Sequence, residues 1–257
     1  MTKQSYFTYE SGSAVRNAAT VVFGVAIWLL GWVMMTLTSS PMAKGAAFLW
    51  LPAALQLMAG VWLGPKRGLI AGGLGAYAAG ISAYGGWGLP DIIMNPVAGG
   101  LANSMLPGLL FAAFNINPDF DIKRKNVFGS FLLILTLVAA VIALAFWLRS
   151  FDLGPFGYAP PFLLLLIAPI AFKRLRLSGG DFALALLICI FASALSAAFG
   201  VLGTVVAGQP LPAAIIGTGI GWFLGDTVSC VLGLYALGAF TERARDVGVA
   251  PLSRPVS

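Results

Sequence analysis

Eight stretches of this chain are long and apolar enough, or nearly so, to cross a lipid bilayer. A spanning helix needs about 20 mostly apolar residues, because each residue rises about 1.5 Å. We predict spans at 17–38, 45–64, 68–87, 91–114, 127–148, 158–172, 182–206 and 212–240. A helix satisfies its own backbone hydrogen bonds in hydrocarbon. The sequence therefore predicts an all-α membrane protein, a polytopic bundle of about eight transmembrane helices.

The composition agrees with a chain that lies in lipid. Hydrophobic residues make up 59% of the 257 and charged residues only 9%, whereas about a quarter of an average soluble domain is charged. The first apolar run follows a polar segment and lacks a small-residue cleavage site, so we expect it to be retained as a span. We interpret residues 1–257 as a single transmembrane domain.

The distribution of Lys and Arg predicts the orientation, because cytoplasmic loops are enriched in both. With eight spans and a cytoplasmic N-terminus, only Lys44 and Arg149 lie outside. The loop 115–126, the tail 241–257 and both termini are then cytoplasmic. The span 158–172 is short and interrupted by prolines, but omitting it would place the basic cluster 173–176 outside. The inner residues are Lys3, Arg16, Lys66, Arg67, Lys123, Arg124, Lys125, Lys173, Arg174, Arg176, Arg243, Arg245 and Arg254.

Several functional classes are disfavoured. The net charge of +6 is explained by the basic loops, so we expect no nucleic-acid partner. The chain has no histidine, and its two cysteines, Cys189 and Cys230, lie in apolar runs, so neither a metal site nor a disulfide framework is indicated. The turn at 64–68 lacks the Walker pattern, and no nucleophile elbow is present. We predict no catalytic residues, no cofactor and no enzymatic activity.

Three polar side chains are expected at one depth in the membrane. Gln56, Asn103 and Asp226 each lie about 17 to 21 Å below the outer end of their spans, at about 1.5 Å per residue. An amide or carboxyl group in hydrocarbon costs free energy unless it has a partner, so such groups usually face the inside of a bundle. We predict that they share one pocket.

Asp226 is the strongest candidate for a functional residue among the three. It lies in the segment GWFLGDTVS with no basic residue within several turns, and an unpaired carboxylate at mid-membrane costs roughly 2.5 kcal/mol or more. It could contact a cationic or hydrogen-bonding substrate, or it could carry a proton. It could equally be a protonated group bonded across a helix contact, to Gln56 or Asn103. The sequence leaves these alternatives open.

A polar stripe extends along the span 91–114. Asn95, Gly99 and Asn103 follow one another at four-residue spacing and so lie on one face of a helix. Pro96 and Pro107 flank the stripe, and proline in a spanning helix frees backbone carbonyls that can line a polar cavity. Simple bending of the helix is the alternative role for these prolines.

Aromatic residues near the outer ends of the spans complete the candidate site. Trp50, Tyr84, Trp87 and Trp222 can anchor at the interface or stack on a flat ligand. Trp222 is the aromatic residue that we most expect to contact a ligand, because it lies one turn from Asp226 on the same face of the helix. The predicted substrate-binding residues are Gln56, Asn95, Asn103, Trp222 and Asp226.

Small residues predict close helix packing in three spans. Gly, Ala and Ser let the backbone of a neighbouring helix approach. Such residues recur at 72–80, at 193–203 and at 221–233, and we assign most of them to helix contact alone. The relevant residues are Gly72, Gly73, Gly75, Ala76, Ala79, Gly80, Ser193, Ser196, Gly200, Gly203, Gly221, Gly225, Ser229 and Gly233.

Two segments resemble a known family. WLPAALQLMAGVWLGPKRGLIAGGLGAYAAG, with its LGPxxG turn, and NPVAGGLANSMLPGLLFAAF are similar to substrate-binding S components of energy-coupling-factor transporters, over about 70 residues. The resemblance implies an uptake subunit in a prokaryotic plasma membrane that binds a vitamin or similar molecule. It also implies partners, namely a transmembrane coupling subunit and separate ATPases. S components usually have six spans rather than eight.

A second resemblance is to the eight-span membrane-associated sensor domains of bacterial signalling proteins. Their second span often starts with a similar W-x-P-A and ends at a Gly-basic turn, as here at Trp50 and at 64–68. The eight-span count favours this alternative. The main expectation is an integral membrane small-molecule-binding subunit of an uptake transporter, and the alternative is a sensor domain.

Overall fold

The computed structural model describes residues 4–8, 14–38, 50–85, 88–120, 132, 136 and 180–255. The predicted span 158–172 lies outside these residues, as does 127–148 apart from Leu132 and Thr136. The total of eight spans therefore stays a prediction. The elements are β1 (Gln4–Thr8), α1 (Ala14–Thr38), α2 (Pro52–Leu63), α3 (Pro65–Tyr84), α4 (Leu89–Ile92), η1 (Ile93–Met105), α5 (Leu106–Ala113), α8 (Gly180–Val206), α9 (Leu211–Ala214), η3 (Ile215–Gly219), α10 (Ile220–Asp246) and β2 (Leu252–Pro255).

Four helical segments among the described residues are long and apolar enough to cross a membrane. They are Ala14–Thr36, Leu89–Ala113, Asp181–Val206 and Leu211–Asp246, which fits an integral membrane protein. Two other predicted spans differ. Within the described residues, the helix expected at 45–64 begins only at Pro52, because proline favours the first turn of a helix. Helix α3 carries Lys66, Arg67 and several glycines, which lower its hydropathy, and it is not among the four.

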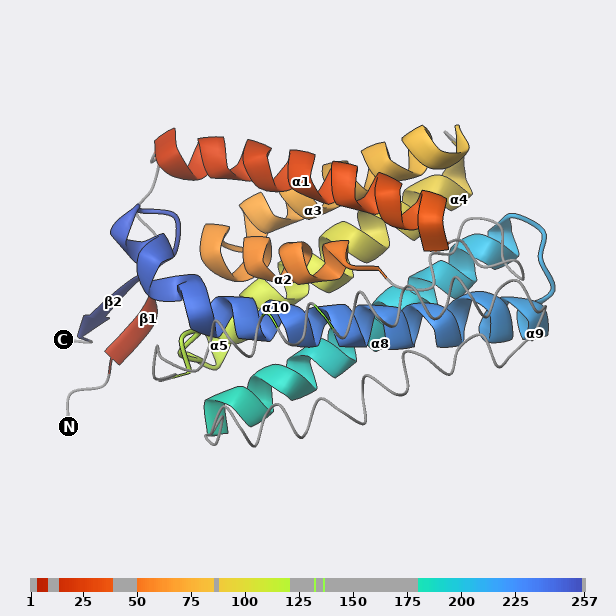
Figure 1. Ribbon diagram of the computed structural model, residues 1–257. Helices are drawn as coiled ribbons and strands as arrows, with labels where there is room; N and C mark the ends of the chain where they lie inside the picture. Colours follow the sequence, from red (N-terminus) through yellow and green to blue (C-terminus); the bar gives the residue numbers. More distant parts are fainter. Residues whose placement is uncertain are drawn as a thin grey trace.

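Helix α10 belongs to the most buried of the four candidate spans. It extends along the molecule beside α2 and α8, while α1 lies along one edge (Figure 1). In the span Leu211–Asp246, 78% of the most apolar window is buried within the protein, against 22% for Ala14–Thr36. Most of this window is therefore covered by neighbouring parts of the protein, whereas most of the window in α1 is not.

The ends of the chain form a small sheet that the sequence analysis did not predict. Strands β1 and β2 pair antiparallel, with Ser5 opposite Arg254 and Thr8 opposite Leu252. Figure 1 shows both termini at one end of the molecule, with α4 and α9 at the other.

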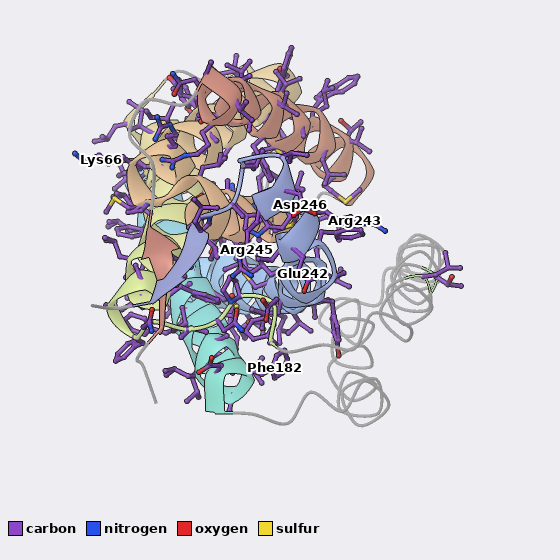
Figure 2. The ribbon with its side chains drawn as sticks, turned by 90° about the vertical axis from the view of Figure 1, so that its left-hand side faces the viewer. Lys66, Phe182, Glu242, Arg243, Arg245 and Asp246 are labelled. Atoms are coloured by element: carbon purple, nitrogen blue, oxygen red, sulfur yellow. The ribbon has the colours of Figure 1, made fainter. Side chains whose placement is uncertain are left out.

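Positive charges gather at the same end as the termini. Among the described residues, every Lys and Arg lies at the start of α1, the start of α3, the end of α10 or in β2. Figure 2 looks onto this end and shows Lys66, Arg243 and Arg245 there. The Arg245 guanidinium pairs with Asp119 at 2.8 Å and ties the end of α10 to the loop after α5. At the opposite end the described residues include only one charged group, Asp91.

Wider, π-helical turns occur in two spans. In the span Leu89–Ala113 they form η1, which contains Pro96, and in the span Leu211–Asp246 they form η3, directly before α10. A proline removes one backbone hydrogen bond and clashes with the preceding turn, so widening the helix accommodates it in η1. The predicted polar stripe Asn95, Gly99 and Asn103 lies in η1.

The backbone of α2 is in direct contact with the backbones of η1 and α5. A Cβ atom built on Gly60 would overlap the backbone oxygen of Ser104, and one built on Gly108 would overlap the backbone oxygen of Gly60. The Ser104 hydroxyl donates to the Gln56 carbonyl oxygen at 2.6 Å across the same contact. Small residues therefore set the position of η1 against α2.

An apolar core fills the half of the bundle near the termini. It is built from α2, α5, α8 and α10, with Leu57, Phe111, Leu234 and Leu237 fully buried. Both cysteines, Cys189 and Cys230, belong to this core and are free thiols. An apolar, packed region therefore lies between the other half of the bundle and the end that carries the termini.

Candidate functional site

A pocket lies in the half of the bundle away from the termini. Helices α1, α3, η1, α8 and α10 contribute its walls, together with Trp50, two residues before α2. Its apolar lining includes Met35, Ala76, Met94 and Ala98. The polar and aromatic side chains that line it are Trp50, Asn95, Asn103, Ser196, Trp222 and Asp226.

Asp226 is held in this pocket by a hydrogen bond from another helix. The Asn103 Nδ2 on η1 donates to Asp226 Oδ2 at 2.9 Å, and Ser196 on α8 lies beside the same carboxyl group. The same Nδ2 donates to Ser196 Oγ at 3.2 Å. All three residues are 1% exposed. Of the two amides that the sequence offered as partners for Asp226, Asn103 makes the bond.

One acceptor of this network has no hydrogen bond. Within the described part of the chain, the buried Asn103 Oδ1 lacks a partner. With Asp226 ionised, the carboxylate sets the orientation of the amide, because turning the amide over would bring Oδ1 against a carboxylate oxygen. A buried acceptor without a donor costs about 1–3 kcal/mol. The structure thus offers a place where a donor from a bound molecule would be favoured.

Asn95 and Trp222 lie in the pocket wall where glycines make room for them. A Cβ atom on Gly80 would lie 2.5 Å from Asn95 Nδ2, and one on Gly200 would lie 2.5 Å from Trp222 Cε3. The sequence analysis assigned both glycines to helix packing alone. They also fix the side chains of the candidate site, which is a role that spacing along one helix does not show.

Gln56 is near the pocket but does not line it. Its Oε1 accepts from Trp50 Nε1 at 3.3 Å, and its Nε2 lies 3.5 Å from the Gly72 carbonyl oxygen, at the limit of a hydrogen bond. A Cβ atom on Gly99 would lie 2.5 Å from the same Nε2, so the amide passes over this glycine. Gln56 therefore holds the Trp50 ring through this hydrogen bond, from outside the pocket. The structure does not bring it to the carboxylate.

Several lining residues were not among the predicted substrate-binding residues. Trp50 was one of the aromatics expected to anchor at the interface or to stack on a flat ligand, and Ser196 was expected only as a small packing residue. The sequence pattern does not mark Met35 and Met94 as pocket residues, because a methionine in an apolar span is normally a packing residue. The serine could have been suspected from its position on α8, where it shares a face with Gly200.

The cavity is small in this structure. Its volume is about 20 Å³, which suits one water-sized group because a single water needs roughly 10–15 Å³ measured in this way. A vitamin would enter only after wall side chains had moved. In the described residues no group of three or more His, Cys, Asp or Glu residues could hold a metal ion.

The fold and site together define a helical membrane protein with a buried polar pocket. No protein-family model, curated protein or solved structure matches the chain. The functional argument therefore depends on the residues themselves.

Proposed function

We propose that this chain is an integral membrane subunit that binds a small molecule for uptake, energised by separate partner subunits. The observation that carries the proposal is the pocket at Asp226 and Asn103. It holds a buried carboxyl group and an unsatisfied amide oxygen inside the bundle, where lipid supplies no partner for either. Polar groups buried in membrane helices commonly mark solute pathways. The proposal assigns no catalytic step to the chain.

The proposed orientation places the termini in the cytoplasm of a prokaryotic cell and the pocket toward the outside. The positive-inside rule supports it, because the described Lys and Arg residues gather at the end that carries the termini. The apolar core between the pocket and that end supports an outward-facing pocket. Release to the cytoplasm would then require partner subunits to rearrange the bundle.

A thermal-shift screen tests ligand binding. The detergent-purified protein is heated with vitamins, nucleobase-like compounds and small amines, since a ligand at 100 times its Kd stabilises the folded state by about 2.7 kcal/mol. We expect at least one compound to raise the Tm of the wild type and not that of Asn103→Ala. Asp246→Asn, a change at an exposed carboxylate on the cytoplasmic end, is the matched control. A Tm that no compound moves would contradict the proposal.

Co-purification separates transport from sensing. The sensor-domain alternative uses the same pocket, so binding data alone do not distinguish the two functions. We expect affinity purification from the native membrane to recover a transmembrane coupling subunit and ATPases. Recovery of a kinase or a cyclase in their place would favour the sensor.

A further inference from the structure

The hydrogen-bonding capacity left in the network of Asn103 and Asp226 is that of an acceptor. The Asn103 amide has two N–H groups, and its Nδ2 already donates to both Asp226 and Ser196. The Ser196 hydroxyl, which lies beside the carboxyl group, has a single proton. The groups still free are Asn103 Oδ1 and the remaining lone pairs of the carboxylate, which has about four acceptor sites. A molecule that binds to this network must therefore donate hydrogen bonds.

The charge of the pocket also favours a hydrogen-bond donor, and a positively charged one. Asp226 is the only charged residue among those that line the cavity in the described part of the chain, and none of them is Lys or Arg. A carboxylate removed from water without a counter-charge is strongly destabilising. A positively charged donor would compensate for this cost, whereas a phosphate or a carboxylate would increase it.

The remaining walls suit an organic cation better than a metal ion. Trp50 and Trp222 both line the cavity, and a tryptophan ring attracts an ammonium group placed over its face. Met35 and Met94 add polarisable thioethers. A divalent cation such as Ca²⁺ takes about 6–8 oxygen ligands, but the cavity offers one carboxylate and a few amide or hydroxyl oxygens.

From these observations we propose that the solute bound at this site carries a protonated amine. The ammonium group donates to Asp226 and to Asn103 Oδ1, in the cavity that both tryptophans line. The cavity volume of about 20 Å³ matches a group the size of water, which is also about the size of an ammonium head. This inference rests on the proposed function, because it names the chemical class of the solute at the same pocket.

Charged thiol reagents test the inference without knowledge of the natural solute. Met94→Cys places a reactive thiol in the wall and leaves both tryptophans and the carboxylate intact. The purified protein is treated with aminoethyl methanethiosulfonate, a cation, and with sulfonatoethyl methanethiosulfonate, an anion. Each rate is normalised to the rate with free cysteine. The wild type is the background control, because Cys189 and Cys230 are 0% exposed.

We expect the normalised rate of the cation to exceed that of the anion by about tenfold or more, as a pocket of one charge sign concentrates its counter-ion. Adding Asp226→Asn to Met94→Cys should abolish most of this preference, whereas adding Asp246→Asn should preserve it. Equal normalised rates would overturn the amine assignment and leave a solute-accessible pocket. A thiol that neither reagent modifies would overturn the proposed function as well.

Direct binding of the smallest member of the class provides a second measurement. Methylammonium chloride should raise the Tm of the wild type relative to sodium chloride at the same ionic strength, and Asp226→Asn should remove this difference. Methanol, a neutral donor of similar size, should give no such shift. A methanol effect equal to that of methylammonium would overturn the requirement for positive charge.

Discussion

Asn103 and Asp226 are 123 positions apart in the sequence and meet at 2.9 Å between the Nδ2 and Oδ2 atoms. Their bond joins η1 to α10, which belongs to the most buried of the four candidate spans. Because the donor also bonds to Ser196 on α8, one amide connects three helices at the pocket. The contact is therefore both a structural link and the basis of the proposed binding site.

Replacement of Asn103 tests the structural part of this link. Asn103→Ala removes a donor from a buried carboxyl group, and leaving such a group short of a partner costs about 1–3 kcal/mol. We expect the free energy of unfolding to fall by no more than this amount, because the substitution also removes the unsatisfied Asn103 Oδ1. The measurement is denaturant or thermal unfolding of the purified protein, with Thr36→Ala, an exposed hydroxyl on α1, as the control within about 0.5 kcal/mol of wild type.

A double-mutant cycle isolates the pair. Asn103→Ala, Asp226→Ala and the double variant should show a coupling of about 0.5–3 kcal/mol, as contacting residues do. Additive effects would show that the two side chains do not interact. The cycle matters because Ser196 could otherwise account for the cost of either single substitution.

Gly200→Ala should displace the Trp222 ring. The added Cβ would lie 2.5 Å from Cε3 and 2.9 Å from Cδ2 of that ring, closer than real contacts allow. We expect a shift in tryptophan fluorescence, weaker binding of any pocket ligand and a stability loss of about 1–3 kcal/mol from overpacking.

Gly24→Ala is the matched control for that substitution. Its Cβ would meet only Ala71, at an ordinary 3.8 Å, and alanine is favoured over glycine in a helix by roughly 0.5–1 kcal/mol. Fluorescence and binding should therefore match the wild type, with unchanged or higher stability. If the two variants behaved alike, the proposed role of Gly200 beneath Trp222 would be wrong.

The sequence predicts how deep in the membrane the polar residues lie better than it predicts which neighbouring helix their side chains face. A rise of about 1.5 Å per residue places Gln56, Asn103 and Asp226 at one level, and the structure brings two of them together. The rotation of each helix about its axis is a different quantity, fixed by contacts between helices. The amide of Gln56 passes over Gly99 and meets Trp50 instead, which no pattern within one span reveals.

Long-range contacts account for the other differences. The pairing of β1 with β2 depends on two polar segments from opposite ends of the chain, and neither has a strong strand pattern of its own. Likewise, Ser196 becomes a site residue only because α8 lies against η1. Apolar length and loop charge predict which segments form helices, but they do not predict which side chains meet.

Gly60→Ala should disrupt the crossing of α2 and η1. Its Cβ would overlap the backbone oxygen of Ser104, and backbone cannot move aside as a side chain can. We expect a loss of about 3 kcal/mol or more, or failure to accumulate in the membrane. Gly73→Ala, where the nearest atom is 3.4 Å away, should fold normally and serves as the control. Near-wild-type stability of Gly60→Ala would show that the helices are not in backbone contact.

Cysteine labelling in intact cells tests the orientation. Leu89→Cys lies at the end with α4 and α9, where Leu89 is 60% exposed, and Lys66→Cys lies at the end with the termini. Because basic residues gather at the latter end, we expect a membrane-impermeant maleimide to label Leu89→Cys in intact cells and Lys66→Cys only after lysis. The wild type should remain unlabelled, since its cysteines are buried. The reverse pattern would turn the pocket toward the cytoplasm and would exclude a role in capturing solute from outside.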